Sequence, residues 1–456
     1  MRSDNKRALI YGAGNNCIFS MYELCKRFEI IGIADGDASK QGKSLFGLQI
    51  GKISDFDKDS FDIVIITPSY SASIRDALIE EGIDGKKLIP LEDALADSED
   101  GSNLSIAIIF YGGLGDYIIG KNWLYHLNEY ADLSNAEIHA YFNGSTLENA
   151  EAVFSDSELV TDISPIDTDR PELIQENTYS LIMRFSVFPM VQYLDGHSLS
   201  IFNKKLFSYA ADLWKFGSEN YNTGFFSSPD FYRTVSSLFR MFPDKKYHAI
   251  YDVLNNLKSP EEYHCNYSIA IDEDAYLSEL GLEPGNYITV NTGANEEYSR
   301  KPSTRTWGHD NWVELISILK DQLKNGMKIV RMGLSSGGDE TKADLDLTGG
   351  TNVEQAKVLL KNAAVHVDYE GGLVHLRYVL NGGPSVVLHG PTSVKRYGYS
   401  ENTPIRSMEC INACEWTERD WLTVCHNEEK PFGCMRSITP EEVSEQVISI
   451  LSRRNK

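Results

Sequence analysis

The chain has no run of 18 uninterrupted apolar residues, which argues against a membrane-spanning helix. Its first seven residues are polar and lead directly into a short apolar segment, which is not the pattern of a secretion signal. Repeats and low-complexity tracts are also absent. These absences predict a folded, cytoplasmic protein without a membrane span.

Positive charge is scarce. The 456 residues include 43 Lys and Arg against 66 Asp and Glu, a formal net charge of −23. Nucleic-acid binding needs a concentrated basic face, so this balance argues against a nucleic-acid partner. It also makes a local group of cations informative, because such a group must overcome the field of the remaining chain if it binds an anion.

Cysteine is sparse except near the C-terminus. Four of the seven cysteines fall within 25 residues, namely Cys410, Cys414, Cys425 and Cys434. In a reducing compartment this clustering indicates metal binding before disulfides. Four thiolates suit tetrahedral zinc or iron, and the site would be structural because no ligand position stays open. The alternative is a set of free, buried thiols.

The length suggests two to four domains, and the sequence divides into three α/β units. A small Rossmann-like domain is expected over residues 1–96, followed by an acidic linker. A second unit is expected over 104–275 and a third over 276–456. The expected strands are 8–11, 30–34, 62–67, 105–110, 137–142, 181–185, 287–290, 328–332, 365–367 and 385–388.

Helices are expected between these strands. Their ranges are 20–28, 72–81, 118–130, 312–324 and 353–361, with a last helix that a capping box at Thr439 begins. The aromatic-rich stretch 202–257 is expected to be mostly helical. It is interpreted as core packing, and within it 202–242 is the region where we expect acceptor contacts.

A glycine-rich turn follows the first strand of the second unit. Gly112, Gly113 and Gly115 allow the backbone to approach a ligand at the start of the next helix. Asp116, beside them, suits a general base that takes a proton from an attacking hydroxyl. An equally good alternative is that Asp116 merely caps the helix, which would stabilise the protein by about 0.5–2 kcal/mol.

The third unit has a polar glycine turn after its first strand. Thr292 and Gly293 lie there, and the cations Lys301 and Arg305 follow. Cations and amide donors would stabilise a departing nucleoside diphosphate, which gains negative charge in the transition state. The alternative is a solvated basic loop.

A second glycine turn in the third unit opens a helix. The amides of Gly371, Gly372 and Leu373 can point at phosphate oxygens, and Glu370 can accept hydrogen bonds from sugar or ribose hydroxyls. His375 lies one turn into that helix, where a histidine is more often a packing residue. After the following strand, Thr392 could also reach a phosphate.

Both later units thus place a glycine turn at the carboxyl ends of their strands, where open α/β sheets bind ligands. At these motifs the sequence resembles the heptosyltransferase-like glycosyltransferases of family 9. The resemblance covers about residues 104–456 and is strongest between Thr348 and Thr392. It implies two facing Rossmann-like lobes of the GT-B type, with an inverting mechanism that needs no catalytic metal.

The resemblance assigns roles residue by residue. Gly115-Asp116 is similar to the family's Gly-Asp motif, which implies that Asp116 is the base. Arg305 stands where members usually have a Lys that contacts the donor phosphates, and Glu370 stands where many have Asp. Both are departures from the family pattern. Arg keeps the charge of Lys but changes the geometry of the contact, and Glu-Gly-Gly replaces the usual Asp-Thr-Gly turn. The family implies an ADP-heptose donor, and its autotransporter heptosyltransferases hold an iron ion with four such cysteines.

The front domain resembles small Rossmann-like domains of sugar acyltransferases and polysaccharide-biosynthesis dehydratases. Gly12, Gly14 and Asp35 partly match a dinucleotide fingerprint, which suggests cofactor binding. No catalytic residue set accompanies them, so we expect a nucleotide-sugar-binding, regulatory or assembly role.

The sequence therefore predicts an enzyme that transfers a sugar, expected to be a heptose, from a nucleotide diphosphate to a hydroxyl of a bacterial glycan or protein. Homo-oligomers are compatible with this. One rival is a nucleotide-sugar oxidoreductase or epimerase acting through the front domain. Another is a non-catalytic nucleotide-sugar-binding module that serves assembly.

Overall fold

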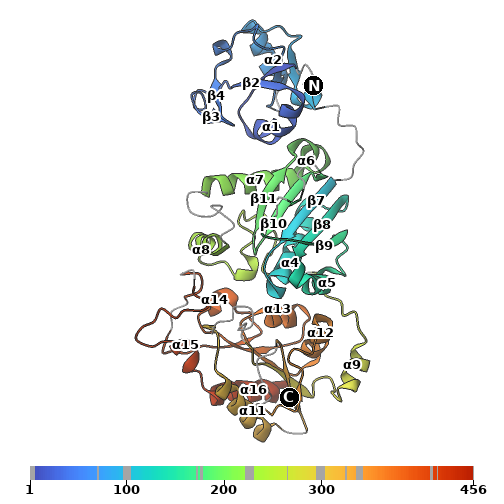
Figure 1. Cartoon of the computed structure of the whole chain (residues 1–456), viewed down its shortest axis with the longest axis vertical. Helices are drawn as coiled ribbons and strands as arrows, with labels where there is room; N and C mark the ends of the chain where they lie inside the picture. The colour runs from blue at the N-terminus through green and yellow to red at the C-terminus, as the bar shows by residue number, and fades with distance from the viewer. Residues whose placement is uncertain are drawn as a thin grey trace.

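The computed structural model contains three successive α/β units (Figure 1). It describes residues 6–68, 71–95, 104–170, 173–174, 178–220, 231–263, 265–293, 303–323, 326–334, 342–410, 414–417 and 420–454. Each unit is built on one sheet, and the predicted fold class of two Rossmann-like lobes behind a small Rossmann-like domain is confirmed. Within the described residues, no helix is both long and apolar enough to cross a bilayer.

The front domain has a six-stranded sheet of order β3-β4-β2-β1-β5-β6. Its strands are β1 (Arg7–Tyr11), β2 (Glu29–Ala34), β3 (Ser44–Leu45), β4 (Leu48–Gly51), β5 (Ile63–Ile66) and β6 (Leu88–Pro90). Its helices are α1 (Asn15–Arg27), α2 (Ser71–Glu80) and α3 (Leu91–Ala94). The expected linker, residues 96–103, lies outside the described residues.

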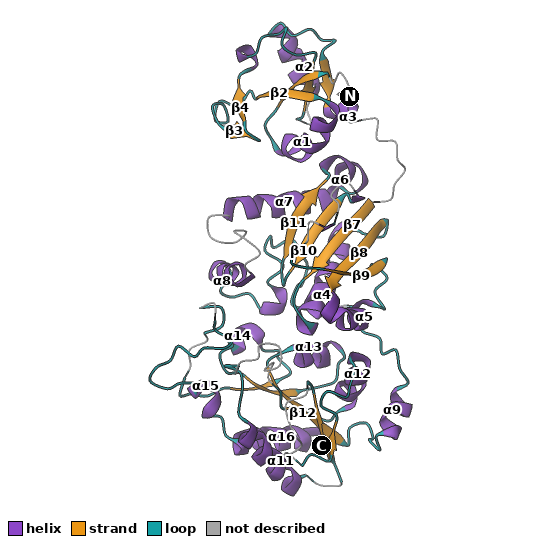
Figure 2. Cartoon of the chain, viewed as in Figure 1, coloured by secondary structure: helices purple, strands orange, loops and turns teal. Residues whose placement is uncertain are grey.

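The middle lobe has the sheet order β11-β10-β7-β8-β9 (Figure 2). Its strands are β7 (Leu104–Phe110), β8 (Ala136–Asn143), β9 (Asp162–Ile166), β10 (Leu181–Phe185) and the antiparallel edge strand β11 (Pro189–Leu194). Its helices are α4 (Leu114–Ala131), α5 (Leu147–Phe154), α6 (Gly196–Phe202), α7 (Lys204–Asn220) and α8 (Phe231–Met241).

The C-terminal lobe has a parallel sheet of order β14-β13-β12-β15-β16-β17. Its strands are β12 (Tyr287–Asn291), β13 (Lys328–Met332), β14 (Leu345–Asp346), β15 (His366–Tyr369), β16 (Ser385–Leu388) and β17 (Thr403–Ile405). Its helices are α9 (Glu273–Glu279), α11 (His309–Gln322), α12 (Val353–Asn362), α13 (Gly372–Val379), α14 (Val394–Tyr397), α15 (Gly433–Arg436) and α16 (Pro440–Arg454).

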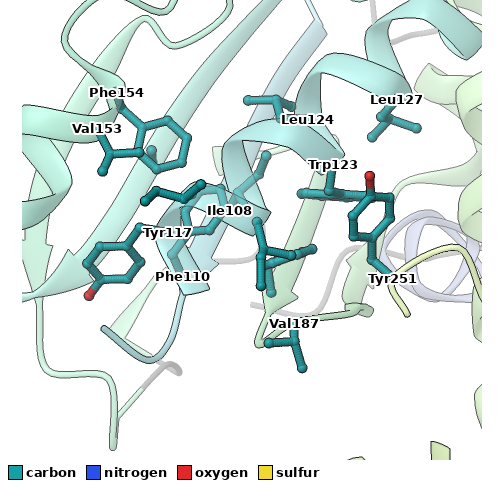
Figure 3. Packing of buried hydrophobic residues seen from close by; sticks show 14 of the residues in the cluster. Ile108, Phe110, Tyr117, Trp123, Leu124, Leu127, Val153, Phe154, Val187 and Tyr251 are labelled. Carbon is teal, nitrogen blue, oxygen red and sulfur yellow. The ribbon is translucent and has the colours of Figure 1, made fainter. Parts of the chain in front are cut away.

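Helix α4 is buried on nearly every side, which is why its sequence lacks a clean polar face. Its Trp123 lies in this packing near Leu124 and Tyr251 (Figure 3). Trp123 stacks on Phe185 of β10 and donates a hydrogen bond to the hydroxyl of Tyr209 at 3.0 Å. Phe110, from the end of β7, stacks on Phe142. This aromatic core fixes the helix whose first turn carries Asp116.

The two lobes share one continuous apolar core. A buried cation also joins them: Lys357 of α12 donates to the carbonyl oxygens of Ala152 in α5 and Ser268 in the segment between the lobes. Glu354 pairs with Lys357 at 2.7 Å. At the same junction the first turns of α4 and α13 lie against each other.

The front domain contacts the middle lobe through α1 and α6. Phe19 of α1 is buried and its ring meets Phe207 edge-on at 5.6 Å. A Cβ on Gly196, at the start of α6, would lie 2.4 Å from the Cβ of Phe19. The close approach therefore depends on a residue without a side chain.

Candidate active site between the lobes

Asp116 lies at the switch point of the middle sheet, where strand order reverses between β7 and β10. It belongs to the first turn of α4, so the expectation that this helix starts at 118 was wrong by four residues. The start shifts because the Asp116 carboxylate accepts the backbone N–H of Gly113 at 2.9 Å and so caps the helix.

The cap and the base interpretations of Asp116 are compatible. One carboxylate oxygen accepts the Gly113 N–H, and the other accepts the hydroxyl of Tyr247 at 3.2 Å. Gly112 has φ +102°, and a Cβ there would lie 2.2 Å from Oδ2 of Asp116. Only glycine at position 112 therefore leaves room for this carboxylate.

The pKa of Asp116 is raised above its usual range. Burial is the largest cause, and the negative charge of Glu370 adds to it. The Gly113 N–H, His375 and the Tyr247 hydroxyl oppose the shift. A carboxylate that holds protons more tightly than usual is a better general base.

Glu370 lies on the C-terminal side of the same junction. It follows β15, beside the switch point between β12 and β15. Arg305 donates a hydrogen bond to its carbonyl oxygen at 2.9 Å and lies 3.5 Å from its Oε2, while Nε2 of His375 lies 3.7 Å from its Oε1. Burial alone would raise the pKa of Glu370, but His375 and Arg305 hold it below its usual range.

The two glycine turns meet directly. A Cβ on Gly372 would lie 3.2 Å from the backbone nitrogen of Gly115, and a Cβ on Gly115 would lie 3.0 Å from Cδ2 of His375. Asp116, His375, Glu370 and Arg305 thus form one cluster across the lobe junction, as the sequence predicts. The amides of Gly371, Gly372 and Leu373 begin α13 beside it, where the first N–H groups of a helix have no intrahelical acceptor.

The other predicted contacts of the C-terminal lobe lie at neighbouring strand ends. The Thr292 hydroxyl follows β12 and accepts the Nε–H of the buried Arg331 at 2.8 Å. The Gly293 N–H donates to the Asn291 side chain at 3.2 Å. Thr392 is buried beyond β16, and its hydroxyl has no hydrogen-bond partner among the residues that the structure describes. Lys301 lies outside the described residues.

Sequence reasoning missed several residues of this site. Tyr247 begins a short 3-10 helix after α8, and the buried His389 and Glu415 lie beyond β16. Nδ1 of His389 and Oε2 of Glu415 have no hydrogen-bond partner within the described part of the chain. Burial raises the pKa of Glu415 to about 7 and lowers that of His389 to about 4. No periodic pattern marks these residues.

A small cavity borders this cluster. Its lining comes from the carboxyl ends of β15 and β16, from α13, and from the stretch between the end of α14 and β17, namely Glu370, Gly371, Val374, His375, Val387, His389, Tyr397, Gly398, Tyr399, Asn402 and Pro404. The predicted Glu370, Gly371 and His375 therefore share one cavity with His389, Tyr397 and Tyr399, which the sequence did not predict.

The four clustered cysteines lie near one another. Burial, the largest cause, raises the pKa of the Cys434 thiol to about 12. Negative charge on Cys410, Cys414 and Cys425 raises it further, which places all four sulfurs close together. The N–H of Phe432 donates to Sγ of Cys425 at 3.1 Å, and the Asn427 amide donates to Sγ of Cys410 at 3.3 Å. Among the described residues, no three Cys, His, Asp or Glu side chains stand in metal-ligand geometry.

In the front domain, Asp35 already has partners. Its carboxylate accepts the N–H of Ala13, in the glycine turn, at 2.6 Å and that of Asp37 at 2.8 Å, and it pairs with Lys40 at 3.0 Å. Gly12 has φ +105°, and a Cβ there would lie 2.6 Å from Pro68. Asp35 thus holds the turn containing Gly12 and Gly14; cofactor binding there stays a prediction.

Comparison with known proteins supports the fold. The iron-containing dodecameric glycosyltransferase TibC of enterotoxigenic E. coli H10407 superposes with a TM-score of 0.50 at 14% identity, covering 78% of each chain. The chain shares its fold with this glycosyltransferase. The predicted similarity to heptosyltransferase-like enzymes is confirmed at the level of the fold.

Two further structures are similar with TM-scores of 0.48. The ADP-heptose lipopolysaccharide heptosyltransferase II of E. coli is 16% identical, and the match covers 77% of this chain and all of that one. The family 9 glycosyl transferase of Veillonella parvula DSM 2008 is 13% identical, with 77% and 97% covered. Residues 4–89 match the family model "C2185-like, N-terminal". A search of curated protein sequences finds no match.

Proposed function

We propose that the chain is an inverting glycosyltransferase that moves a sugar from a nucleotide diphosphate to a hydroxyl of a glycan or protein. The observation that carries the proposal is the meeting of Asp116 with the Glu370–Gly372 turn across the lobe junction. One side supplies a carboxylate base, and the other supplies amides and a cation for a leaving diphosphate.

The steps follow from the residues. Asp116 takes the proton of the acceptor hydroxyl, whose oxygen attacks the anomeric carbon of the donor sugar. The bond to the diphosphate breaks on the opposite face, which inverts the anomeric centre. The first amides of α13 and the Arg305 guanidinium stabilise the charge that develops on the diphosphate. Glu370, kept ionised by Arg305 and His375, accepts hydrogen bonds from sugar or ribose hydroxyls.

The donor in this proposal is ADP-heptose. Solved neighbours include TibC in complex with ADP-D-β-D-heptose and the E. coli heptosyltransferase WaaC with ADP. The buried, unpartnered Thr392 hydroxyl and His389 Nδ1 support a polar ligand at the end of β16, because such groups are nearly always satisfied in a complete structure. Asp116, Arg305 and the first amides of α13 supply the base and the stabilisation of the leaving diphosphate. We therefore expect sugar transfer to continue when a metal chelator is present.

Titration calorimetry with a panel of nucleotide sugars, followed by mass spectrometry of the products, tests the proposal. We expect an ADP-sugar to bind and its sugar to be transferred or hydrolysed. Binding without turnover would favour a non-catalytic module. NAD(P) binding to the front domain with a change in the cofactor's absorbance would favour an oxidoreductase.

We also propose that Cys410, Cys414, Cys425 and Cys434 hold a structural iron or zinc ion. Their proximity and the N–H donors to two of their sulfurs support it, because such hydrogen bonds stabilise thiolate ligands. The iron-containing neighbour TibC has the same overall fold. Elemental analysis is expected to find one metal per chain in the wild type and in Cys25→Ser, and none in Cys434→Ser. A metal-free wild type would contradict the assignment.

A further inference from the structure

Tyr399 joins the lobe junction from behind. It follows α14, is buried, and its hydroxyl lies 2.5 Å from Nδ1 of His375. A second tyrosine, Tyr263 from the segment between the lobes, places its hydroxyl 3.3 Å from that of Tyr399. The ring of Tyr399 stacks on Tyr378 at 3.8 Å and on His248 at 4.8 Å. These packed rings leave the hydroxyl little freedom to turn away.

The other nitrogen of His375 faces the site. Nε2 lies 3.7 Å from Oε1 of Glu370, and the ring edge packs on Gly115. An ionised carboxylate only accepts hydrogen bonds, so this neighbour favours a proton on Nε2. In the neutral imidazole Nδ1 is then an acceptor, and the hydroxyl of Tyr399 donates to it. Tyr263 can in turn donate to the oxygen of Tyr399.

We propose that Tyr399 is a positioning residue that fixes the tautomer and the orientation of His375, so that the Nε2–H points at Glu370 beside the base Asp116. The inference rests on the proposed function, because it assumes that His375 and Glu370 border the donor sugar. A hydroxyl suits this task in both protonation states of His375. It donates to the neutral ring and accepts from the imidazolium, so the ring need not turn.

Tyr399→Phe tests the role of the hydroxyl, because it keeps the stacked ring. We expect kcat to fall about 10- to 100-fold, as when the orienting partner of a functional histidine is removed, with little change in donor affinity. The matched control is Tyr378→Phe, which removes a hydroxyl from the ring stacked on Tyr399 and keeps the Tyr399–His375 bond. Its kcat should stay within about threefold of the wild type, and thermal unfolding should confirm that both variants fold.

Nitrogen-15 NMR of histidine-labelled protein gives a readout that needs no activity. We expect His375, assigned by the loss of its signals in His375→Gln, to carry its proton on Nε2 in the wild type and to populate both tautomers in Tyr399→Phe. A proton on Nδ1 in the neutral wild type, or an unchanged spectrum in Tyr399→Phe, would overturn the inference. If the wild type transfers no sugar, the proposed function fails, whereas the spectrum still decides the role of Tyr399.

Discussion

Gly372 of one lobe touches Gly115 of the other: a Cβ at position 372 would lie 3.2 Å from the backbone nitrogen of Gly115. The contact brings together two helix N-termini that are 257 residues apart in the sequence (372 − 115). A side chain at position 115 presses on the His375 ring, and one at position 372 presses on the Gly115 backbone and the Leu114 side chain. The following predictions depend on this junction and on the groups around it.

Gly115→Val should disrupt the junction. The new side chain meets the His375 ring and the Gly372 backbone, so we expect a loss of stability about 1–3 kcal/mol larger than for Gly113→Val, together with a loss of turnover. Gly113→Val is the matched control for stability, because a Cβ there meets nothing within 4 Å. Urea unfolding measures the difference, and equal midpoints and slopes would contradict the close approach.

Asp116→Asn should not destabilise the protein. Burial raises the pKa of Asp116 in the folded state, so the group favours folding below its unfolded pKa, and this contribution is lost as the pH rises through the folded pKa. At neutral pH the buried charge therefore costs stability, and the neutral amide removes that cost. Thermal unfolding at neutral pH should show an unchanged or higher midpoint for Asp116→Asn. A clearly lower midpoint would contradict the cost assigned here to the buried charge.

Tyr247→Phe should shift the pH profile. The Tyr247 hydroxyl stabilises the ionised Asp116, so its removal raises the pKa of the base further. The rise of kcat/KM with pH, which follows deprotonation of Asp116, should then move to higher pH. Tyr276→Phe on α9 serves as the control and should leave the profile in place. A shift to lower pH in Tyr247→Phe would mean that Asp116 is not the group being titrated.

Lys357→Met should destabilise the contact between the lobes. The variant keeps the aliphatic stem but leaves Glu354 and two carbonyl oxygens without their buried cation, at a cost of about 3 kcal/mol. Lys361→Met on the same helix removes only a partly exposed pair with Glu273 and should cost about 1 kcal/mol or less. Urea unfolding compares the stability of the two variants. Equal losses of stability would argue against a buried contact of Lys357 between the lobes.

The sequence predicts the bounds of the interior strands β10, β13 and β16. Each is mostly apolar and buried without alternation, although β10 and β13 each include an arginine. The short edge strands β9, β11, β14 and β17 were not predicted. β9, β11 and β17 include a proline, and β14 has only two residues.

The glycine turns of the site were predictable, whereas the side chains around them were not. Glu370 directly follows β15, and Asp116 lies in the first turn of the helix after β7, so topology alone brings each to the carboxyl edge of its sheet. Tyr247 lies in a three-residue 3-10 helix, and Tyr263 and Tyr399 lie in loops, so only tertiary packing assembles them. Tyr397 and Tyr399 flank Gly398 shortly after the Gly-Pro-Thr turn at 390–392. This was the local sequence pattern that could have pointed to side chains of the site.

Turnover of the donor sugar by Asp116→Asn tests the central claim most directly. With an ADP-sugar shown to bind, product mass spectrometry should find transfer or hydrolysis by the wild type and by Asp132→Asn, a substitution at the far end of the same helix. Asp116→Asn should bind the donor equally well and turn over about 10²- to 10⁴-fold more slowly. Turnover within a few fold of the wild type would contradict the assignment of Asp116 as the base.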